Sequence, residues 1–206
     1  MDNFVSILNN SEISLEIKKS KFIGFSFFIE NELEAQKIIS NYCKQFADAT
    51  HVCYAYVLNS IEKCSDNGEP SGTAGKPMLE IIKKMELKNV LVIVVRYFGG
   101  VKLGAGGLNR AYGDTAKQTL VSSGKAEYNA CNNYKFTFNL GVEDKMFNKF
   151  YLNQVNVNSK YYSNLAVYEV SIFKQDCAKV LNDISETVKR NNYYTFLNSN
   201  YIKKEI

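Results

Sequence analysis

The sequence has few of the residues from which metal centres and catalytic triads are built. Histidine occurs once, at His51, tryptophan is absent and proline occurs only twice. The five cysteines are an odd number, are widely spaced and form no C-x-x-C pair. This pattern predicts reduced thiols in a cytoplasmic protein, with no disulfides, no metal site and no cofactor. No catalytic residue can be named, so a binding protein is expected rather than an enzyme.

Hydropathy and charge argue against three further classes. There is no apolar run of about eighteen residues, so no membrane span is expected, and residues 1–12 lack the basic and apolar segments of a secretory signal. The net charge of +4 is spread evenly, with 15 basic and 13 acidic residues in 1–125 and 10 and 8 in 126–206. That balance differs from the strongly basic one of a non-specific nucleic-acid binder.

Hydrophobic periodicity predicts an α+β protein of two domains, 1–125 and 131–206. In the first domain Asn31 is a good cap for a helix that runs to about residue 46. Residues 60–75, rich in Ser, Asp, Asn, Gly and Pro, are expected to form a loop. The remaining expected elements are strands at 12–17, 22–29, 51–58 and 90–95 and helices at 77–85 and 108–121.

The second domain shows a clear alternation of elements. Strands are expected at 134–140, 157–162, 166–173 and 193–202, with helices at 143–153 and 176–190. This βαββαβ order is that of the ferredoxin-like fold. Before it, the turn-rich segment 122–133 is expected to be an exposed, protease-sensitive linker.

Residues 96–113, RYFGGVKLGAGGLNRAYG, form a glycine-rich segment between a predicted buried strand and a predicted helix. It contains six of the twelve glycines and two of the three arginines, Arg96 and Arg110. Bare backbone N–H groups in such a place can surround an anion, and arginine supplies planar, bidentate donors. In the alternative interpretation, the glycines only permit tight turns and close packing, and Arg96 pairs with Asp114 or Glu69.

A second candidate is the polar loop, residues 65–77, SDNGEPSGTAGKP. It does not fit a Walker loop, because Pro70 and Pro77 stand where glycine and Ser/Thr are required. The dinucleotide fingerprint also fails, at Asn109. His51 is expected to order this loop through Asp66 or Glu69. The expected binding residues are Arg96, Tyr97, Gly99, Gly100, Lys102, Gly104, Gly106, Gly107 and Arg110 from the glycine-rich segment, with Asp66, Glu69, Ser71, Thr73 and His51.

Several segments together resemble the IMPACT family, in its bacterial YigZ-type two-domain form. They are KSKFI at 19–23, ATH at 49–51 with AY at 55–56, the polar loop, and RYFGG at 96–100 with LG, GGL and RAY up to residue 112. The resemblance covers residues 18–115. Asn67 stands where the family usually has a second aspartate, which argues against a metal bound by paired carboxylates.

The resemblance implies a first domain folded like the second domain of ribosomal protein S-five and a domain of elongation factor G. It implies a ferredoxin-like second domain, similar to another domain of elongation factor G. Eukaryotic members of the family act as translation regulators. The leading hypothesis is thus a cytoplasmic protein that binds RNA, the ribosome or a translation factor through the glycine-rich segment. The alternatives are a small enzyme acting on a phosphorylated metabolite and a protein–protein adaptor.

Overall fold

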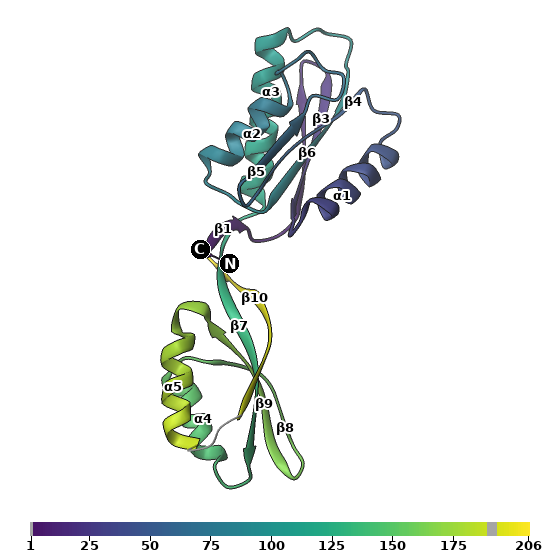
Figure 1. Ribbon diagram of the computed structural model, residues 1–206. Coiled ribbons are helices and arrows are strands. Elements are labelled where there is room, and N and C mark those ends of the chain that lie inside the picture. The colour runs from purple at the N-terminus through teal and green to yellow at the C-terminus, as the bar shows by residue number, and fades with distance from the viewer. Residues whose placement is uncertain (1, 189–192) are drawn as a thin grey trace. The chain divides into compact units, whose positions relative to one another are not determined.

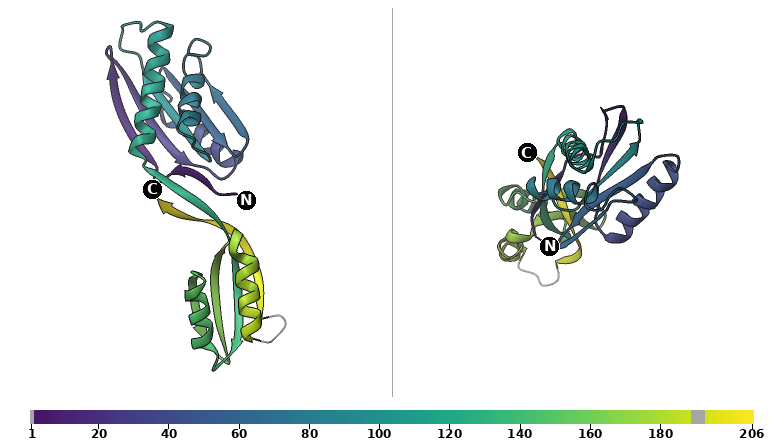
Figure 2. Two further views of the ribbon diagram at one scale, coloured as in Figure 1. Left: turned by 90° about the vertical axis from the view of Figure 1, so that its left-hand side faces the viewer. Right: turned by 90° about the horizontal axis from the view of Figure 1, so that it is seen from above.

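The computed structural model describes residues 2–188 and 193–206. The chain divides into two compact units, one made of Phe4–Glu127 with Lys204–Ile206 and the other built mainly from Tyr128–Lys203. Each unit has a sheet with helices packed on it (Figures 1 and 2). The α+β class is therefore confirmed.

The first unit is built around a five-stranded antiparallel sheet with the order β2-β3-β6-β4-β5. The central strand β6 is an almost continuous apolar run that is buried on both faces, as its sequence indicates. The strands are β2 (Ser11–Ile17), β3 (Ser20–Phe28), β4 (His51–Leu58), β5 (Ile61–Ser65) and β6 (Val90–Tyr97).

Helices cover both faces of this sheet. Figure 1 shows α1 (Glu32–Gln45) on one face, and α2 (Gly75–Lys84) and α3 (Ala105–Ser122) on the other. The capping role of Asn31 is confirmed, because its side chain accepts a hydrogen bond of 2.9 Å from the backbone N–H of Glu34. Two separate hydrophobic cores result, one on each face of the sheet.

Two strands of the first unit differ from the sequence-based expectation. Strand β1 (Phe4–Ile7) was not predicted, and β5 occupies part of the segment 60–75 that was expected to be a loop. Strand β5 lies at the edge of the sheet and its residues are largely exposed. It therefore lacks the alternation of buried and exposed residues from which strands are recognised.

The second unit has the predicted element order βαββαβ, and its sheet order is β10-β7-β9-β8. One face of the sheet carries α4 and α5 (Figure 2), over a core that contains Phe136, Phe138 and Phe150. The ferredoxin-like fold is confirmed. The elements are β7 (Lys125–Asn139), α4 (Glu143–Leu152), β8 (Asn156–Tyr162), β9 (Leu165–Phe173), the short 3-10 turn Lys174–Asp176, α5 (Cys177–Val188) and β10 (Tyr194–Glu205). The expected end of the last helix, 189–190, lies outside the described residues.

The expectation of an irregular linker at 122–133 is wrong. Helix α3 runs to Ser122, and β7 begins at Lys125 and continues without a break to Asn139. The Asn residues of this turn-rich segment occupy a strand whose buried positions include Ala130 and Cys131. All five cysteines are free thiols. In the parts of the chain that are described, none of the helices is both long and apolar enough to span a membrane.

Candidate anion-binding cavity

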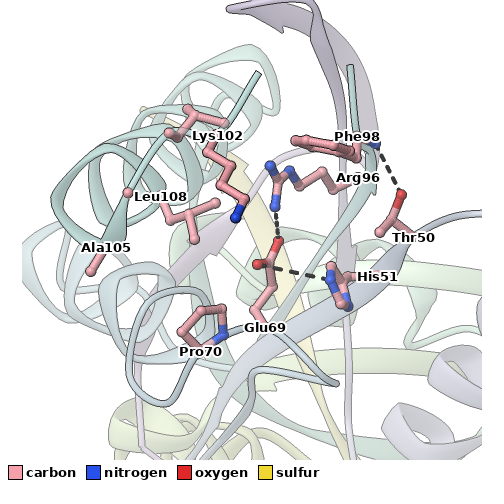
Figure 3. A pocket seen from close by; sticks show the side chains of 11 residues that line it. Thr50, His51, Glu69, Pro70, Arg96, Phe98, Lys102, Ala105 and Leu108 are labelled. Carbon is pink, nitrogen blue, oxygen red and sulfur yellow. Dashed lines mark hydrogen bonds and ion pairs between the residues drawn. The ribbon is translucent and has the colours of Figure 1, made fainter. Parts of the chain in front are cut away.

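A cavity of about 340 Å³ lies in the first unit, beside the beginning of α3 (Figure 3). Residues from β4 and β6, from the polar loop and from the glycine-rich segment line it. The lining residues are Thr50, His51, Glu69, Pro70, Arg96, Phe98, Lys102, Leu103, Gly104, Ala105 and Leu108. The cavity thus brings together the two segments that the sequence singled out.

Strand register brings the central charged residue into place. Arg96 near the end of β6 lies opposite Phe22 on β3 and opposite His51 on β4. These three residues form one row across the sheet, because directly opposed residues of antiparallel strands point to the same face. The guanidinium of Arg96 lies 5.5 Å from the ring centre of Phe22 and 5.5 Å from that of Phe98.

Arg96 and Glu69 form a buried ion pair. Nη1 of Arg96 lies 2.6 Å from Oε1 of Glu69, and the two side chains are only 6% and 2% exposed. The hydroxyl of Tyr112 on α3 donates a second hydrogen bond of 2.8 Å to the same oxygen. Nε of Arg96 is buried and has no hydrogen-bond partner among the described residues. The arginine therefore pairs with Glu69 through Nη1 and keeps Nε as a donor without a partner among the described residues.

Cys53 contacts Tyr112, a partner of Glu69 in this cluster, and is not a reactive thiol. Its Sγ donates to the carbonyl of Asp66 at 2.8 Å and contacts the hydroxyl of Tyr112 at 3.5 Å. Burial raises the pKa of Cys53 to about 12, and burial also raises the pKa of Tyr112. Both groups remain protonated at neutral pH, so a Cys53 thiolate is not available as a nucleophile.

His51 contacts the polar loop at Asn67 and at Glu69, of which the expectation named only Glu69. Its Nδ1 lies 3.0 Å from the carbonyl oxygen of Asn67, so the proton resides on Nδ1 and is donated to that oxygen. Its Nε2 lies 3.9 Å from Oε2 of Glu69. The ring also lies close to Gly68, where an added Cβ would be 3.1 Å from Nδ1. The imidazole is oriented by the loop and presents Nε2 to the carboxylate.

Asp66 holds the polar loop onto the beginning of α2. Its carboxylate accepts backbone hydrogen bonds from Gly72 at 2.7 Å, from Ala74 at 3.0 Å and from Gly75 at 2.8 Å. Burial opposes ionisation, but these three donors outweigh it, so the pKa of Asp66 is below its ordinary value. The positive end of α2 is consequently already occupied by a carboxylate of the chain itself.

The beginning of α3 is different. Its N-cap is Gly104 at φ 73°, a conformation that favours glycine, and no described side chain caps the helix or places an acid in its first turn. A Cβ at Gly106 would meet nothing within 4 Å. Gly104 and Ala105 line the cavity, and the side chain of Lys102 extends over it (Figure 3). Unpaired N–H groups and a lysine therefore lie together at the cavity.

The cavity contains only part of the expected set. His51, Glu69, Arg96, Lys102 and Gly104 line it, and Gly106 follows in the first turn of α3. The other expected residues do not line it. They are Tyr97, Gly99, Gly100, Gly107 and Arg110 from the glycine-rich segment and Asp66, Ser71 and Thr73 from the polar loop.

Several of these residues have local structural contacts. Tyr97 packs on the opposite face of the sheet and donates to Asp48 at 3.1 Å, because neighbouring strand residues point to opposite faces. A Cβ at Gly99 would lie 1.8 Å from the carbonyl oxygen of Lys19, so this glycine permits a close packing of two loops. Thr73 donates to the carbonyl of Pro70 within its own loop. Arg110 is exposed on α3.

Sequence reasoning left six lining residues out of the site: Thr50, Pro70, Phe98, Leu103, Ala105 and Leu108. Most are apolar, and apolar residues in a sequence indicate core packing first. Only Phe98 carried a signal, as an aromatic residue in the glycine-rich segment beside Tyr97. Among the described residues, no group of three or more His, Cys, Asp or Glu side chains is placed to hold a metal ion.

The fold and the cavity define a two-unit α+β protein with a cationic pocket at an uncapped helix start. Residues 18–120 match the model of the Impact N-terminal domain. The chain belongs to the IMPACT family.

The curated relatives include bacterial members of that family. The chain is 45% identical over 130 residues to the IMPACT family member YvyE of Bacillus subtilis, a match covering 62% of this chain and 60% of that protein. It is 39% identical over 110 residues to the IMPACT family member YigZ of Escherichia coli, covering 51% and 54%. The matches thus span between half and two thirds of these relatives' length.

One solved structure matches nearly the whole chain. It is described as the crystal structure of a hypothetical protein, has a TM-score of 0.67 at 24% identity, and the match covers 96% of this chain and 97% of that one. At this identity the likeness concerns the fold. Both units of the chain, in their order along the sequence, therefore occur together in another protein.

Proposed function

We propose that this protein is a translation-associated binding protein that holds a phosphate-bearing ligand, RNA in the first instance, at the cavity beside α3. The observation that carries this proposal is the uncapped start of α3 together with the unpartnered, buried Nε of Arg96. An uncapped helix start offers backbone donors and a positive partial charge to an anion. The translation setting comes from the family to which the chain belongs.

The charges around the cavity favour an anion at its mouth. Arg96 and Lys102 are positive and Glu69 is negative, so one positive charge remains when His51 is neutral. The partial charge at the helix start adds about half a positive charge. Asp66 supplies the contrast within the same unit, because a carboxylate of the chain already fills the equivalent position at α2.

The second candidate is an enzyme that acts on a phosphorylated metabolite. The Oε2 atom of Glu69 and Nε2 of His51 lie 3.9 Å apart on the cavity wall, and such a pair could move a proton. Against this, Oε1 of Glu69 is already bound by Arg96 and Tyr112. One oxygen of this carboxylate is thus held by two donors of the fold itself.

The test measures RNA binding by fluorescence anisotropy with a fluorescein-labelled ten-nucleotide single strand over a range of salt concentrations. Lys102→Ala should weaken binding and reduce the slope of log K against log salt by about 0.7, the value for one contact to a single strand. Lys117→Ala is the matched control, because Lys117 is an exposed lysine on α3 that does not line the cavity. It should bind as the wild type does.

Two results would count against the proposal. One is the absence of measurable RNA binding by the wild type at low salt. The other is equal weakening by Lys102→Ala and Lys117→Ala, which would indicate a diffuse charge effect. Turnover of a phosphorylated metabolite that is lost in Glu69→Gln would favour the enzyme instead.

A further inference from the structure

We infer that the cavity takes up a single unstacked nucleobase, whose attached phosphate lies outside it at the start of α3. The inference rests on the proposed function and specifies the ligand as a nucleotide, either within single-stranded RNA or free. It follows from three properties of the cavity: its walls, its aromatic side chain and the polar groups on its floor.

The walls are too apolar and the space too large for a phosphate alone. Pro70, Leu103, Ala105 and Leu108 contribute to the lining, and the volume is about 340 Å³. That volume is within the range of small-molecule sites, which are mostly apolar with a few placed polar groups. A phosphate ion would leave these apolar walls in contact with water, whereas a planar base would cover them.

An aromatic surface borders the cavity. Phe98 lines it and is 46% exposed, unlike most aromatic residues of this unit. The guanidinium of Arg96 covers one part of the ring from 5.5 Å. Unstacked bases of single-stranded RNA pack on such aromatic side chains and on arginine guanidinium planes. Phe98 thus supplies a contact that a base uses and a phosphate does not.

The floor presents an acceptor next to donors. Among the described residues, Oε2 of Glu69 accepts no hydrogen bond and lies 3.9 Å from Nε2 of His51. Nε of Arg96 likewise has no hydrogen-bond partner there. A phosphodiester group of RNA is an anion with acceptors only, so the Glu69 carboxylate would repel it there. The Watson–Crick edge of a base offers a donor beside an acceptor and matches this pair.

The mouth of the cavity suits the phosphate. Lys102 and Ala105, the first residue of α3, lie on one side of the cavity, and His51 lies on the other (Figure 3). An anion bound at the start of α3 would lie within reach of Lys102. The phosphate of one nucleotide would thereby meet the positive groups at the start of α3, and its base would meet Glu69 and Arg96.

The experiment combines competition with a pair of aromatic variants. The labelled ten-nucleotide RNA is displaced by GMP, AMP, CMP and UMP in turn, and by ribose 5-phosphate, which has the phosphate but no base. We expect at least one mononucleotide to compete about tenfold or more better than ribose 5-phosphate. Phe98→Ala should weaken RNA binding by about fivefold or more, the loss of one base–aromatic contact, with the salt slope unchanged. Phe147→Ala, an exposed phenylalanine of α4, is the control.

The outcomes separate this inference from the proposed function. If ribose 5-phosphate competes as well as the best mononucleotide and Phe98→Ala binds normally, the nucleobase inference is overturned while phosphate binding stands. If mononucleotides bind directly in calorimetry but RNA does not, the cavity holds a free nucleotide and the RNA function is overturned. If neither binds, both are overturned.

Discussion

The guanidinium of Arg96 lies 2.6 Å from the carboxylate of Glu69, and both side chains are almost fully buried. The pair joins the central strand β6 to the polar loop and, through Tyr112, to α3. A cation that had been expected to bind ligand is thus first a structural partner of an acid. Its remaining donors are what the cavity offers to a ligand.

Replacing Arg96 by alanine should destabilise the first unit strongly. Glu69 would remain as a buried charge with only the Tyr112 hydroxyl, and removal of one partner of a buried ion pair costs about 3–5 kcal/mol. Arg96→Lys should recover only part of this, because lysine lacks the planar fork and its contact with Phe22. Thermal melts followed by circular dichroism test both variants.

The companion variant is Arg110→Ala. Arg110 is exposed and lies outside the cavity lining, so this change should leave both the melting temperature and the RNA affinity close to those of the wild type. A melting temperature for Arg96→Ala equal to that of Arg110→Ala would show that the Arg96–Glu69 pair contributes nothing measurable.

Acid should weaken the attachment of the polar loop to α2. The pKa of Asp66 is lower in the folded protein than its ordinary value of 3.8, so its contribution to stability is present above that value and is lost as the pH falls through the folded pKa. Asp66→Asn should cost about 1 kcal/mol at pH 7, as the loss of a helix cap does.

Urea unfolding at pH 7 and at pH 3 measures this effect. The difference in stability between wild type and Asp66→Asn should shrink at the lower pH, because the carboxylate of the unfolded chain takes up a proton below its ordinary pKa of 3.8. A difference that stays constant over this pH range would argue against a charged cap.

Two glycines of the glycine-rich segment should respond oppositely to alanine. At Gly99 a Cβ would lie 1.8 Å from the backbone oxygen of Lys19, so Gly99→Ala must displace a loop and should destabilise the protein by more than 1 kcal/mol. At Gly106, within α3, a Cβ would meet nothing within 4 Å. Gly106→Ala should stabilise the helix by about 0.5–1 kcal/mol. Urea titrations of both variants measure the change in unfolding free energy. Equal changes at the two positions would contradict the prediction.

The segment 122–133 should resist proteolysis. Most of it belongs to β7, and residues 131–139 pair with β9. Its backbone is therefore hydrogen-bonded within a sheet and is not free to enter a protease active site. Even Lys125, a trypsin site at the beginning of the strand, donates through Nζ to the carbonyl of Met85. Limited trypsin digestion with mass spectrometry should find no early cut there. A stable fragment ending at Lys125 would refute the prediction.

The sequence by itself determined those helices and strands whose formation depends on residues close together in the chain. The apolar run at 90–95 specified a buried central strand, because only an interior strand accommodates such residues on both faces. Asn31 specified a helix start, because its side chain bonds the free N–H of Glu34. The alternating pattern after residue 134 specified the ferredoxin-like order. Each of these features depends on residues that lie close together in the sequence.

Tertiary structure decided which residues meet in the cavity. Arg96 and Glu69 are 27 residues apart, and their pairing depends on the register of β6 and on the path of the polar loop. From the sequence alone, the partner of Arg96 could have been an anionic ligand, Asp114 or Glu69. It could not separate Asp66, which caps α2, from Glu69, which lines the cavity, because both are acids of one loop. Burial and register distinguish them, since an acid becomes a cap or a pair according to the donors that the folded chain brings to it.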